Sequence, residues 1–174
     1  MKVRKLILNA FFIAMYVVLS YVSINLGNMV ITVSAIPIIM GGMLFGPIAG
    51  LEIGLIGSFL NQMLKYGITP TTILWILPAG VRGGMIGFYA KQNEYQLHQK
   101  QILFIILFSG FVVTTLNTAV MYIDSKLYGY YSFAYVFGAL IARYISAVFT
   151  SMIYFAIIQV LLKYTGIFEK NTFS

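Results

Sequence analysis

The chain has 174 residues, of which 60% are hydrophobic and 9% are charged, whereas about a quarter of the residues in a soluble domain usually carry charge. Eleven Lys and Arg residues against four Asp and Glu residues give a formal net charge of +7. Apolar runs occupy almost the whole length and leave no room for a separate soluble catalytic domain, so the sequence predicts an integral membrane protein.

The apolar runs fit the length of a bilayer crossing, since a core about 30 Å thick takes roughly 20 helical residues. Spans are predicted, in chain order, at 6–24, 29–45, 48–64, 71–90, 102–123 and 131–162. The last is longer than one crossing requires, so we expect it to tilt, kink or protrude. A β-barrel is set aside because its strands would alternate polar and apolar residues in segments of about ten. The expected fold is an all-α membrane protein, with residues 1–174 forming a single domain of six transmembrane helices.

Positive residues gather on one predicted face of the membrane. Lys65 and Lys126 fall on the opposite face, whereas the N-terminus, the connection between the fourth and fifth spans and the C-terminus carry Lys2, Arg4, Lys5, Lys91, Lys100, Lys163 and Lys170. Because short cytoplasmic loops retain positive charge, both termini are predicted to be cytoplasmic in a multi-pass protein of the cell (plasma) membrane. The charge therefore indicates topology and contact with lipid headgroups, not a nucleic-acid surface. A cleavable signal peptide is a weaker alternative, because the first run is too long.

The chain offers little chemistry for catalysis. It has no cysteine, and its one histidine, His98, lies in a polar loop with Glu94 nearby, so no metal site, cofactor site or enzyme activity is expected. No phosphate-binding G-x-x-x-x-G-K-[ST] string occurs, so partner subunits would have to use the ATP in any ATP-driven transport.

Three charged residues fall inside predicted spans, where an ion is costly unless it is paired or hydrated. Glu52 lies one turn inside the third span, and Arg82 and Arg143 lie deeper in the fourth and sixth. Glu52 and Arg82 could pair and lock two helices together. A role in binding substrate is favoured for the arginines.

Two polar, aromatic stretches face the predicted outer side, at 61–75 and 117–131. Amide and hydroxyl groups at this depth need partners inside the protein or a wet pocket, and rings such as Trp75 can stack on a ligand. The sequence therefore predicts an outward-facing pocket for a small polar molecule. Its candidate residues are Asn61, Tyr66, Thr71, Thr72, Trp75, Arg82, Asn117, Tyr131 and Arg143.

Small residues one helical turn apart allow helices to approach closely in lipid. Ala10 and Ala14 form such a pair near the start of the first span. The pairs Gly42 with Gly46, Gly50 with Gly54 and Gly83 with Gly87 are expected mostly to serve internal packing.

Together these features resemble, over the whole chain, the substrate-binding S components of group II energy-coupling factor (ECF) vitamin transporters. The resemblance rests on six short spans, the pair Ala10 and Ala14, and the Gly-Pro turn in Leu44-Phe-Gly-Pro-Ile-Ala-Gly50. The string Tyr66-Gly-Ile-Thr-Pro-Thr-Thr-Ile-Leu-Trp75, followed by Leu77-Pro-Ala-Gly-Val-Arg-Gly83, looks most like the pantothenate-type members.

The resemblance implies a transport subunit that binds a vitamin from outside. A T subunit, docking on Ala10 and Ala14, and two ATPase subunits would drive it to topple and release the vitamin inward. Loops around Gly27, around Gly67 to Thr72 and around Tyr128 to Tyr131 would close the pocket. For pantothenate, Arg82 or Arg143 would bind the carboxylate. The hydroxyl and amide groups of the vitamin would be bound by Asn61, Thr71, Thr72 and Asn117. Apolar walls would be formed by Tyr66, Trp75 and Tyr131.

Several alternatives remain open at this point. Folate, pyridoxine or hydroxymethylpyrimidine could be the ligand, because aromatic walls stack on flat rings as well. A structural or assembly protein without a ligand, a membrane-embedded enzyme and a proton-coupled transporter acting alone are the alternatives of other classes.

Overall fold

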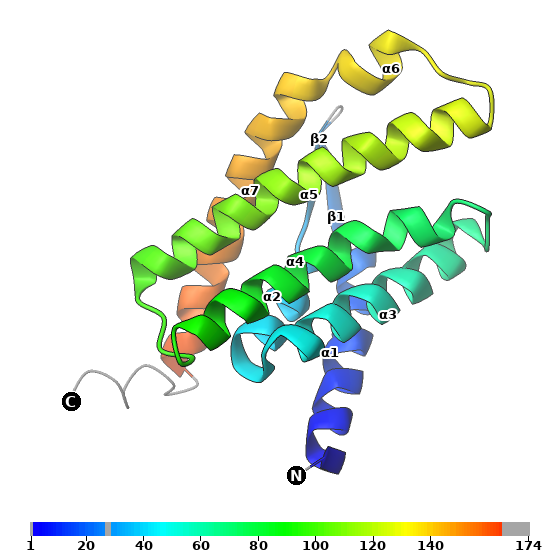
Figure 1. Cartoon of the computed structure of the whole chain (residues 1–174). Coiled ribbons are helices and arrows are strands. Elements are labelled where there is room, and N and C mark those ends of the chain that lie inside the picture. The colour runs from blue at the N-terminus through cyan, green and yellow to red at the C-terminus, as the bar shows by residue number, and fades with distance from the viewer. Residues whose placement is uncertain (1, 27–28, 165–174) are drawn as a thin grey trace.

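The computed structural model describes residues 2–26 and 29–164, and within them seven helices and one β-hairpin follow one another (Figure 1). Helix α1 is followed by strands β1 and β2, which pair antiparallel with Ser23 opposite Thr32 and Leu26 opposite Met29. The elements are α1 (Lys2–Tyr21), β1 (Ser23–Leu26), β2 (Met29–Thr32), α2 (Ala35–Phe45), α3 (Pro47–Tyr66), α4 (Thr72–Gln92), α5 (Gln99–Leu127), α6 (Phe133–Phe137) and α7 (Leu140–Tyr164).

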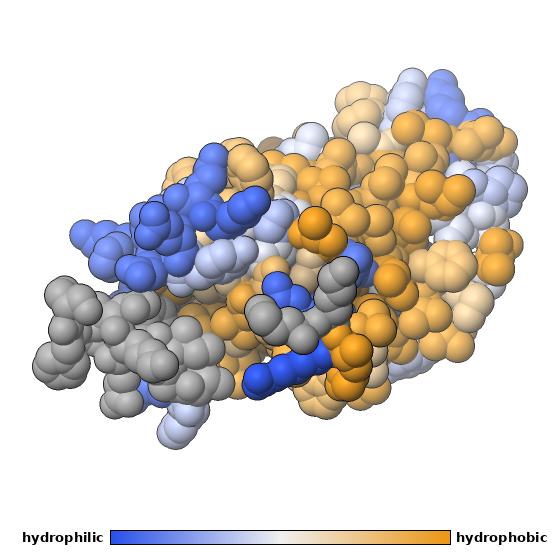
Figure 2. Space-filling view, turned by 60° about the horizontal axis from the view of Figure 1, so that its bottom comes forward, coloured by the Kyte–Doolittle hydropathy of each residue, from blue (hydrophilic) through white to orange (hydrophobic). Residues whose placement is uncertain are grey.

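Four helical segments of the described chain are long and apolar enough to cross a membrane, namely Val3–Tyr21, Thr72–Gln92, Gln99–Leu127 and Phe133–Tyr164. Large apolar side chains such as Phe104, Phe108 and Ile141 are exposed on the outside of the bundle. Figure 2 shows a broad hydrophobic surface on one face, with a group of hydrophilic residues at one end. The prediction of an all-α membrane protein is confirmed, and the cytoplasmic position of the termini stays a prediction.

The segment 22–45 differs from the predicted spans. The spans 6–24 and 29–45 were expected to be helical throughout. Instead, β1 begins at the end of the first of these spans, β2 occupies the start of the second, and α2 has only 11 residues. At 1.5 Å per residue, α2 is about 16 Å long and cannot cross a bilayer core. The run Met29 to Val33 is rich in β-branched residues, which favour strands. Gly27 and Asn28, which lie outside the described residues, form a two-residue sequence typical of hairpins.

The last predicted span, 131–162, is interrupted. Helix α6 ends at Phe137, Gly138 and Ala139 form a turn, and α7 begins at Leu140. This break agrees with the expectation that a run longer than one crossing would kink or protrude.

Glycines bring α2, α3 and α4 into backbone contact. A Cβ at Gly83 would overlap the carbonyl group of Gly50, and one at Gly54 would lie 2.8 Å from the Cα of Gly80. A Cβ at Gly42 would lie 2.8 Å from the carbonyl oxygen of Gly83. The expectation that these glycine pairs serve internal packing is therefore confirmed, and the contact leaves no room for side chains between the helices.

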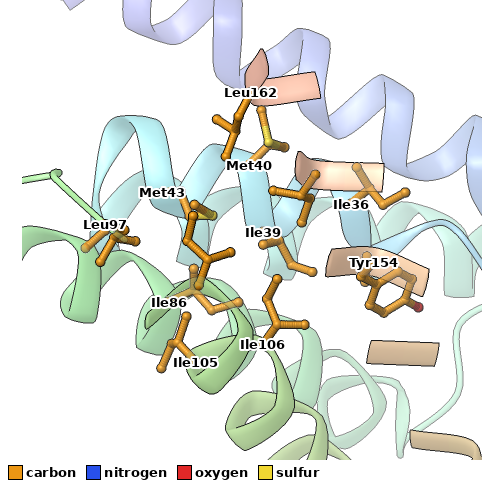
Figure 3. Packing of buried hydrophobic residues seen from close by; sticks show 14 residues of the cluster. Ile36, Ile39, Met40, Met43, Ile86, Leu97, Ile105, Ile106, Tyr154 and Leu162 are labelled. Carbon is orange, nitrogen blue, oxygen red and sulfur yellow. The ribbon is translucent and has the colours of Figure 1, made fainter. Parts of the chain in front are cut away.

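A hydrophobic core closes the end of the bundle where α4 ends, α5 begins and α7 ends. Figure 3 shows side chains from α2, α4, α5 and α7 meeting there, with Ile39, Ile86, Ile106 and Ile158 each at most 1% exposed. The N-terminus and the described end of α7 also lie toward this end of the molecule (Figure 1). A cavity lined by polar side chains, described below, lies in the other half of the bundle.

Replacing Gly83 with alanine is expected to destabilise the protein, since its methyl group would have to displace the backbone of α3. Forcing an extra methyl group into a closely packed site costs about 1–3 kcal/mol. Thermal unfolding in detergent should show a lower midpoint for Gly83→Ala.

The matched control is Gly84→Ala on the same helix, where a Cβ would meet Leu51 at an ordinary 3.7 Å. Alanine favours helix over glycine by about 0.5–1 kcal/mol, so this variant should unfold at the wild-type temperature or above it. Equal midpoints for the two variants would contradict the proposed packing.

Candidate binding cavity

A cavity of about 420 Å³ lies between α1, α2, α3, α4, α5 and α7, in the half of the bundle that also carries the hairpin and α6. This volume is within the range of about 300–1,000 Å³ of small-molecule sites. Three rings, Tyr16, Trp75 and Tyr154, form part of its wall. Its hydroxyl and amide side chains are Thr32, Ser34, Ser58, Asn61, Gln62, Thr114, Asn117, Ser146, Thr150 and Ser151.

The lining residues recur at helical spacing, so several helices each present one face to the cavity. Helix α7 presents residues 143, 146, 147, 150, 151 and 154, and α4 presents residues 75, 78, 79 and 82. Pro78, inside α4, has no N–H to donate to the carbonyl four residues earlier, so the helix is weakened beside the cavity.

Arg82 lies in the cavity wall with an incompletely satisfied guanidinium group. Its Nε atom is buried and has no hydrogen-bond partner among the described residues, and its Cζ atom lies 5.8 Å from the centre of the Tyr154 ring. The sequence allowed Arg82 to pair with Glu52. In the structure the carboxylate of Glu52 instead accepts a hydrogen bond of 2.8 Å from Asn9 Nδ2. Among the described residues, no carboxylate lines the cavity.

Arg143 joins the cavity to α6. Its Nη1 donates to the carbonyl oxygen of Val136 at 3.1 Å, and its Nη2 donates to that of Tyr135 at 3.3 Å. These carbonyls belong to the last residues of a helix, which have no intrahelical partner. Arg143 therefore caps α6 and holds it against the start of α7.

Asn61 connects the cavity wall to the end of α1. The hydroxyl of Ser20 donates to Asn61 Oδ1 at 2.6 Å, and Lys65 Nζ donates to the Ser20 carbonyl oxygen, also at 2.6 Å. The same Lys65 Nζ lies 4.7 Å from the centre of the Tyr21 ring. A cation at a helix C-terminus is favourable, so this group fastens α1 to α3 beside the cavity.

The structure brings together part of the predicted binding set. The residues Asn61, Trp75, Arg82, Asn117 and Arg143 all line the cavity. Whether they contact a substrate stays a prediction.

The remaining predicted residues lie outside the cavity lining. Tyr66 is 71% exposed, and Tyr131 packs against Tyr122 with 5.4 Å between ring centres. Thr71 and Thr72 are almost fully buried, and the hydroxyl of Thr72 accepts a hydrogen bond from the N–H of Thr69 at 2.8 Å. Sequence indicates how deep such residues lie but not the direction in which they point.

Sequence reasoning missed other lining residues, including Tyr16, Ser58, Gln62 and Tyr154. A signal was present in α7, where Ser146, Thr150 and Tyr154 follow Arg143 at intervals of three and four residues. That stripe distinguishes one face of an otherwise apolar helix.

The loops that the resemblance assigned to closure are partly described. Gly67 and Gly129 have φ angles of +74° and +75°, a region that favours glycine, and Gly27 lies outside the described residues. His98 precedes α5, and its N–H donates to Gln101 Oε1 at 2.9 Å. Within the described ranges no group of three or more His, Cys, Asp or Glu residues could hold a metal ion.

Comparison with known proteins gives a match to a family model over nearly the whole chain. The family model of the ECF-type riboflavin transporter S component matches residues 1–163. Two UPF0397 proteins from strains of Streptococcus thermophilus are 30% identical over 66 residues, which are 38% of this chain and 35% of each relative. The match therefore spans about a third of the length of these curated relatives.

Two solved structures share the fold. One, described as the S component of a bacterial ECF transporter, has a TM-score of 0.69 and 16% identity and covers 95% of this chain and 99% of its own. The other is FolT bound with folic acid, which has a TM-score of 0.66 and 20% identity. It covers 89% of this chain and 91% of its own.

Arg143→Ala is expected to loosen α6, because two carbonyl groups would lose their charged donor. Hydrogen bonds to charged groups contribute about 1.5–3 kcal/mol, so local opening should become at least about 10-fold more frequent. Hydrogen–deuterium exchange should show faster exchange over residues 133–139. Arg82→Ala, which removes the other cavity arginine, is the control, and faster exchange in both variants or in neither would contradict the capping role.

Proposed function

This chain belongs to the family of ECF-type riboflavin transporter S components, and we propose that it is the membrane-embedded subunit that binds a water-soluble vitamin for import, with riboflavin as the first candidate. The observation that carries the proposal is the cavity itself, whose lining combines three aromatic rings with hydroxyl and amide groups. Riboflavin has a flat ring system edged with carbonyl and N–H groups and a chain of hydroxyls, so its two parts match the two kinds of side chain in the lining.

The hydrogen bonds inside the helices support a ligand rich in hydroxyl groups. The hydroxyls of Thr114 and Thr150 donate to the carbonyls of Gly110 and Ser146 in their own helices. A hydroxyl group that has donated its proton still has lone pairs, so these threonines offer acceptors to the cavity. A ligand with several hydroxyl donors would satisfy them.

Pantothenate is the second candidate, and a different observation favours it. Arg82 and Arg143 are the charged residues among the described cavity lining, and no carboxylate accompanies them there. A ligand carboxylate would pair with a guanidinium group through charge-assisted hydrogen bonds. Folate, with two carboxylates and a flat ring, would use both the arginines and the aromatic rings of the lining. The likeness to the folate-bound structure concerns the fold alone.

The transport step would need partners. The sequence has no phosphate-binding loop of the G-x-x-x-x-G-K-[ST] kind, so we assign ATP hydrolysis to two ATPase subunits that act through a T subunit. Ala10 and Ala14 are exposed on α1 between the large exposed side chains of Ile7, Phe11 and Val18. Small residues flanked by large ones allow a helix of the T subunit to pack closely there.

A binding screen with the purified chain tests the vitamin. Trp75 is the single tryptophan and lines the cavity, so a bound ligand should change its fluorescence. Riboflavin is expected to bind below micromolar concentration and, well above its Kd, to raise stability by roughly 3–4 kcal/mol in thermal unfolding. Pantothenate, folate, pyridoxine and hydroxymethylpyrimidine complete the panel. Failure of all of them to bind would contradict the proposal.

The effect of Arg82→Gln separates neutral from anionic ligands. Loss of a guanidinium–carboxylate pair should weaken binding of pantothenate or folate by about 100-fold or more. Loss of one hydrogen bond to neutral riboflavin should weaken it by only about 10-fold. Arg4→Gln, on an exposed residue of α1, is the matched control and should bind as the wild type does.

Replacing Ala10 and Ala14 together with leucine tests the partner surface. Vitamin binding by the isolated chain should be unchanged, whereas uptake into cells that contain the T and ATPase subunits should be lost. Ala156→Leu is the control, since it adds the same bulk to an exposed alanine of α7. Uptake at the wild-type level in the double variant would contradict docking at this surface.

A further inference from the structure

Asp124 is a buried carboxylate near the end of α5 that contacts three other segments. It is 8% exposed. Its Oδ1 accepts a hydrogen bond of 3.3 Å from the indole N–H of Trp75, and its Oδ2 accepts one from the hydroxyl of Tyr130. The side chain of Thr71 is a third hydrogen-bond partner. A buried carboxylate is stable only when such donors replace water, so these contacts are tightly coupled.

The contact with Trp75 reaches the cavity. Trp75 is half-buried near the start of α4 and forms part of the cavity wall, whereas Asp124 does not line the cavity. Asp124 therefore acts on the cavity through the indole, which it holds by its one polar atom. The buried Thr71 precedes α4, so the carboxylate also lies beside the N-terminal end of that helix, where a negative charge is favourable.

The contact with Tyr130 reaches the connection between α5 and α6. Tyr130 follows Gly129, its N–H donates to the Ser125 carbonyl oxygen at 3.0 Å, and its ring packs edge-on against Tyr135 of α6 at 5.6 Å. The hydrogen bond to Asp124 raises the pKa of Tyr130 to about 12, so its phenol remains a donor throughout the physiological pH range. Tyr135 is also the residue whose carbonyl Arg143 caps.

We propose that Asp124 is a positioning residue for the cavity: it holds the Trp75 indole in the cavity wall and fastens the Tyr128 to Ser132 connection beside it, so that ligand affinity depends on a residue that does not touch the ligand. The consequence for affinity rests on the proposed function, whereas the placement of Trp75 does not. The same connection has a second contact with α5, since Lys126 Nζ lies 4.1 Å from the centre of the Tyr131 ring.

The single tryptophan allows the placement to be measured without any ligand. In the purified full-length chain, acrylamide should quench Trp75 fluorescence more strongly in Asp124→Ala than in the wild type, because the indole is no longer held. Asp124→Asn retains an oxygen that can accept from the indole, so its quenching should stay close to that of the wild type. Wild-type quenching in Asp124→Ala would overturn the proposal.

Binding of the vitamin identified in the screen measures the consequence. Asp124→Ala should raise its Kd by about 10- to 100-fold, as expected for the loss of one or two hydrogen bonds to a charged group. Tyr130→Phe should raise the Kd by up to about 10-fold. Tyr128→Phe, on a tyrosine of the same connection that is 51% exposed, is the matched control and should leave it unchanged.

The outcomes separate this proposal from the proposed function. Altered quenching with unchanged Kd in Asp124→Ala would overturn the role in binding. If Asp124→Ala does not fold, the vitamin Kd of Tyr130→Phe is compared with that of Tyr128→Phe. Equal Kd values for these two variants would overturn the proposal. A wild type that binds none of the vitamins would refute the proposed function, while the quenching comparison would still decide whether Asp124 holds Trp75.

Discussion

The backbone contact of α4 with α2 and α3 is the constraint on which the cavity depends. Gly83 packs against Gly50 and Gly42 on one side of α4, while Trp75, Pro78 and Arg82 line the cavity. Because the contact is made by backbone atoms, there is no space between α4 and its neighbours for even one methyl group. The position of the cavity residues on α4 is therefore set by glycines that are not themselves part of the cavity lining.

The two ends of the bundle have opposite character because of what lines them. At one end, isoleucine and methionine side chains from four helices pack together in the interior (Figure 3). At the other, Ser, Thr, Asn and Gln side chains leave a space that polar ligands or water can fill. Serine and threonine are tolerated inside such helices because they donate to their own backbone, as Thr114 does to Gly110. Asn117 and Gln62 have amide groups that need more partners, and they face the cavity.

Hydropathy predicted the positions of the long helices α4, α5 and α7 well, but it failed where apolar residues form a strand. The run 29–45 is mostly apolar, so its β-branched start and the Gly-Asn sequence before it were the signals of the hairpin. Arg82 and Asn117, which were chosen for their depth in the predicted spans, are among the residues that line the cavity. Thr71, chosen on the same ground, lies outside the lining, and its partner Asp124 lies 53 residues further along the chain. Depth does not predict such contacts, because they arise only when the helices pack.

Arg82 is a cation in the wall of a cavity inside a membrane protein, so its burial has a cost. A buried donor without a partner costs about 1–3 kcal/mol, and the Nε of Arg82 has none among the described residues. The Tyr154 ring beneath the guanidinium offsets part of the cost of burying a cation in a membrane protein, but it accepts no conventional hydrogen bond. A ligand carbonyl or carboxylate at this position would remove that cost as well as add its own contacts. The Nε of Arg82 therefore favours a ligand that places an acceptor opposite it over a ligand that places an apolar group there.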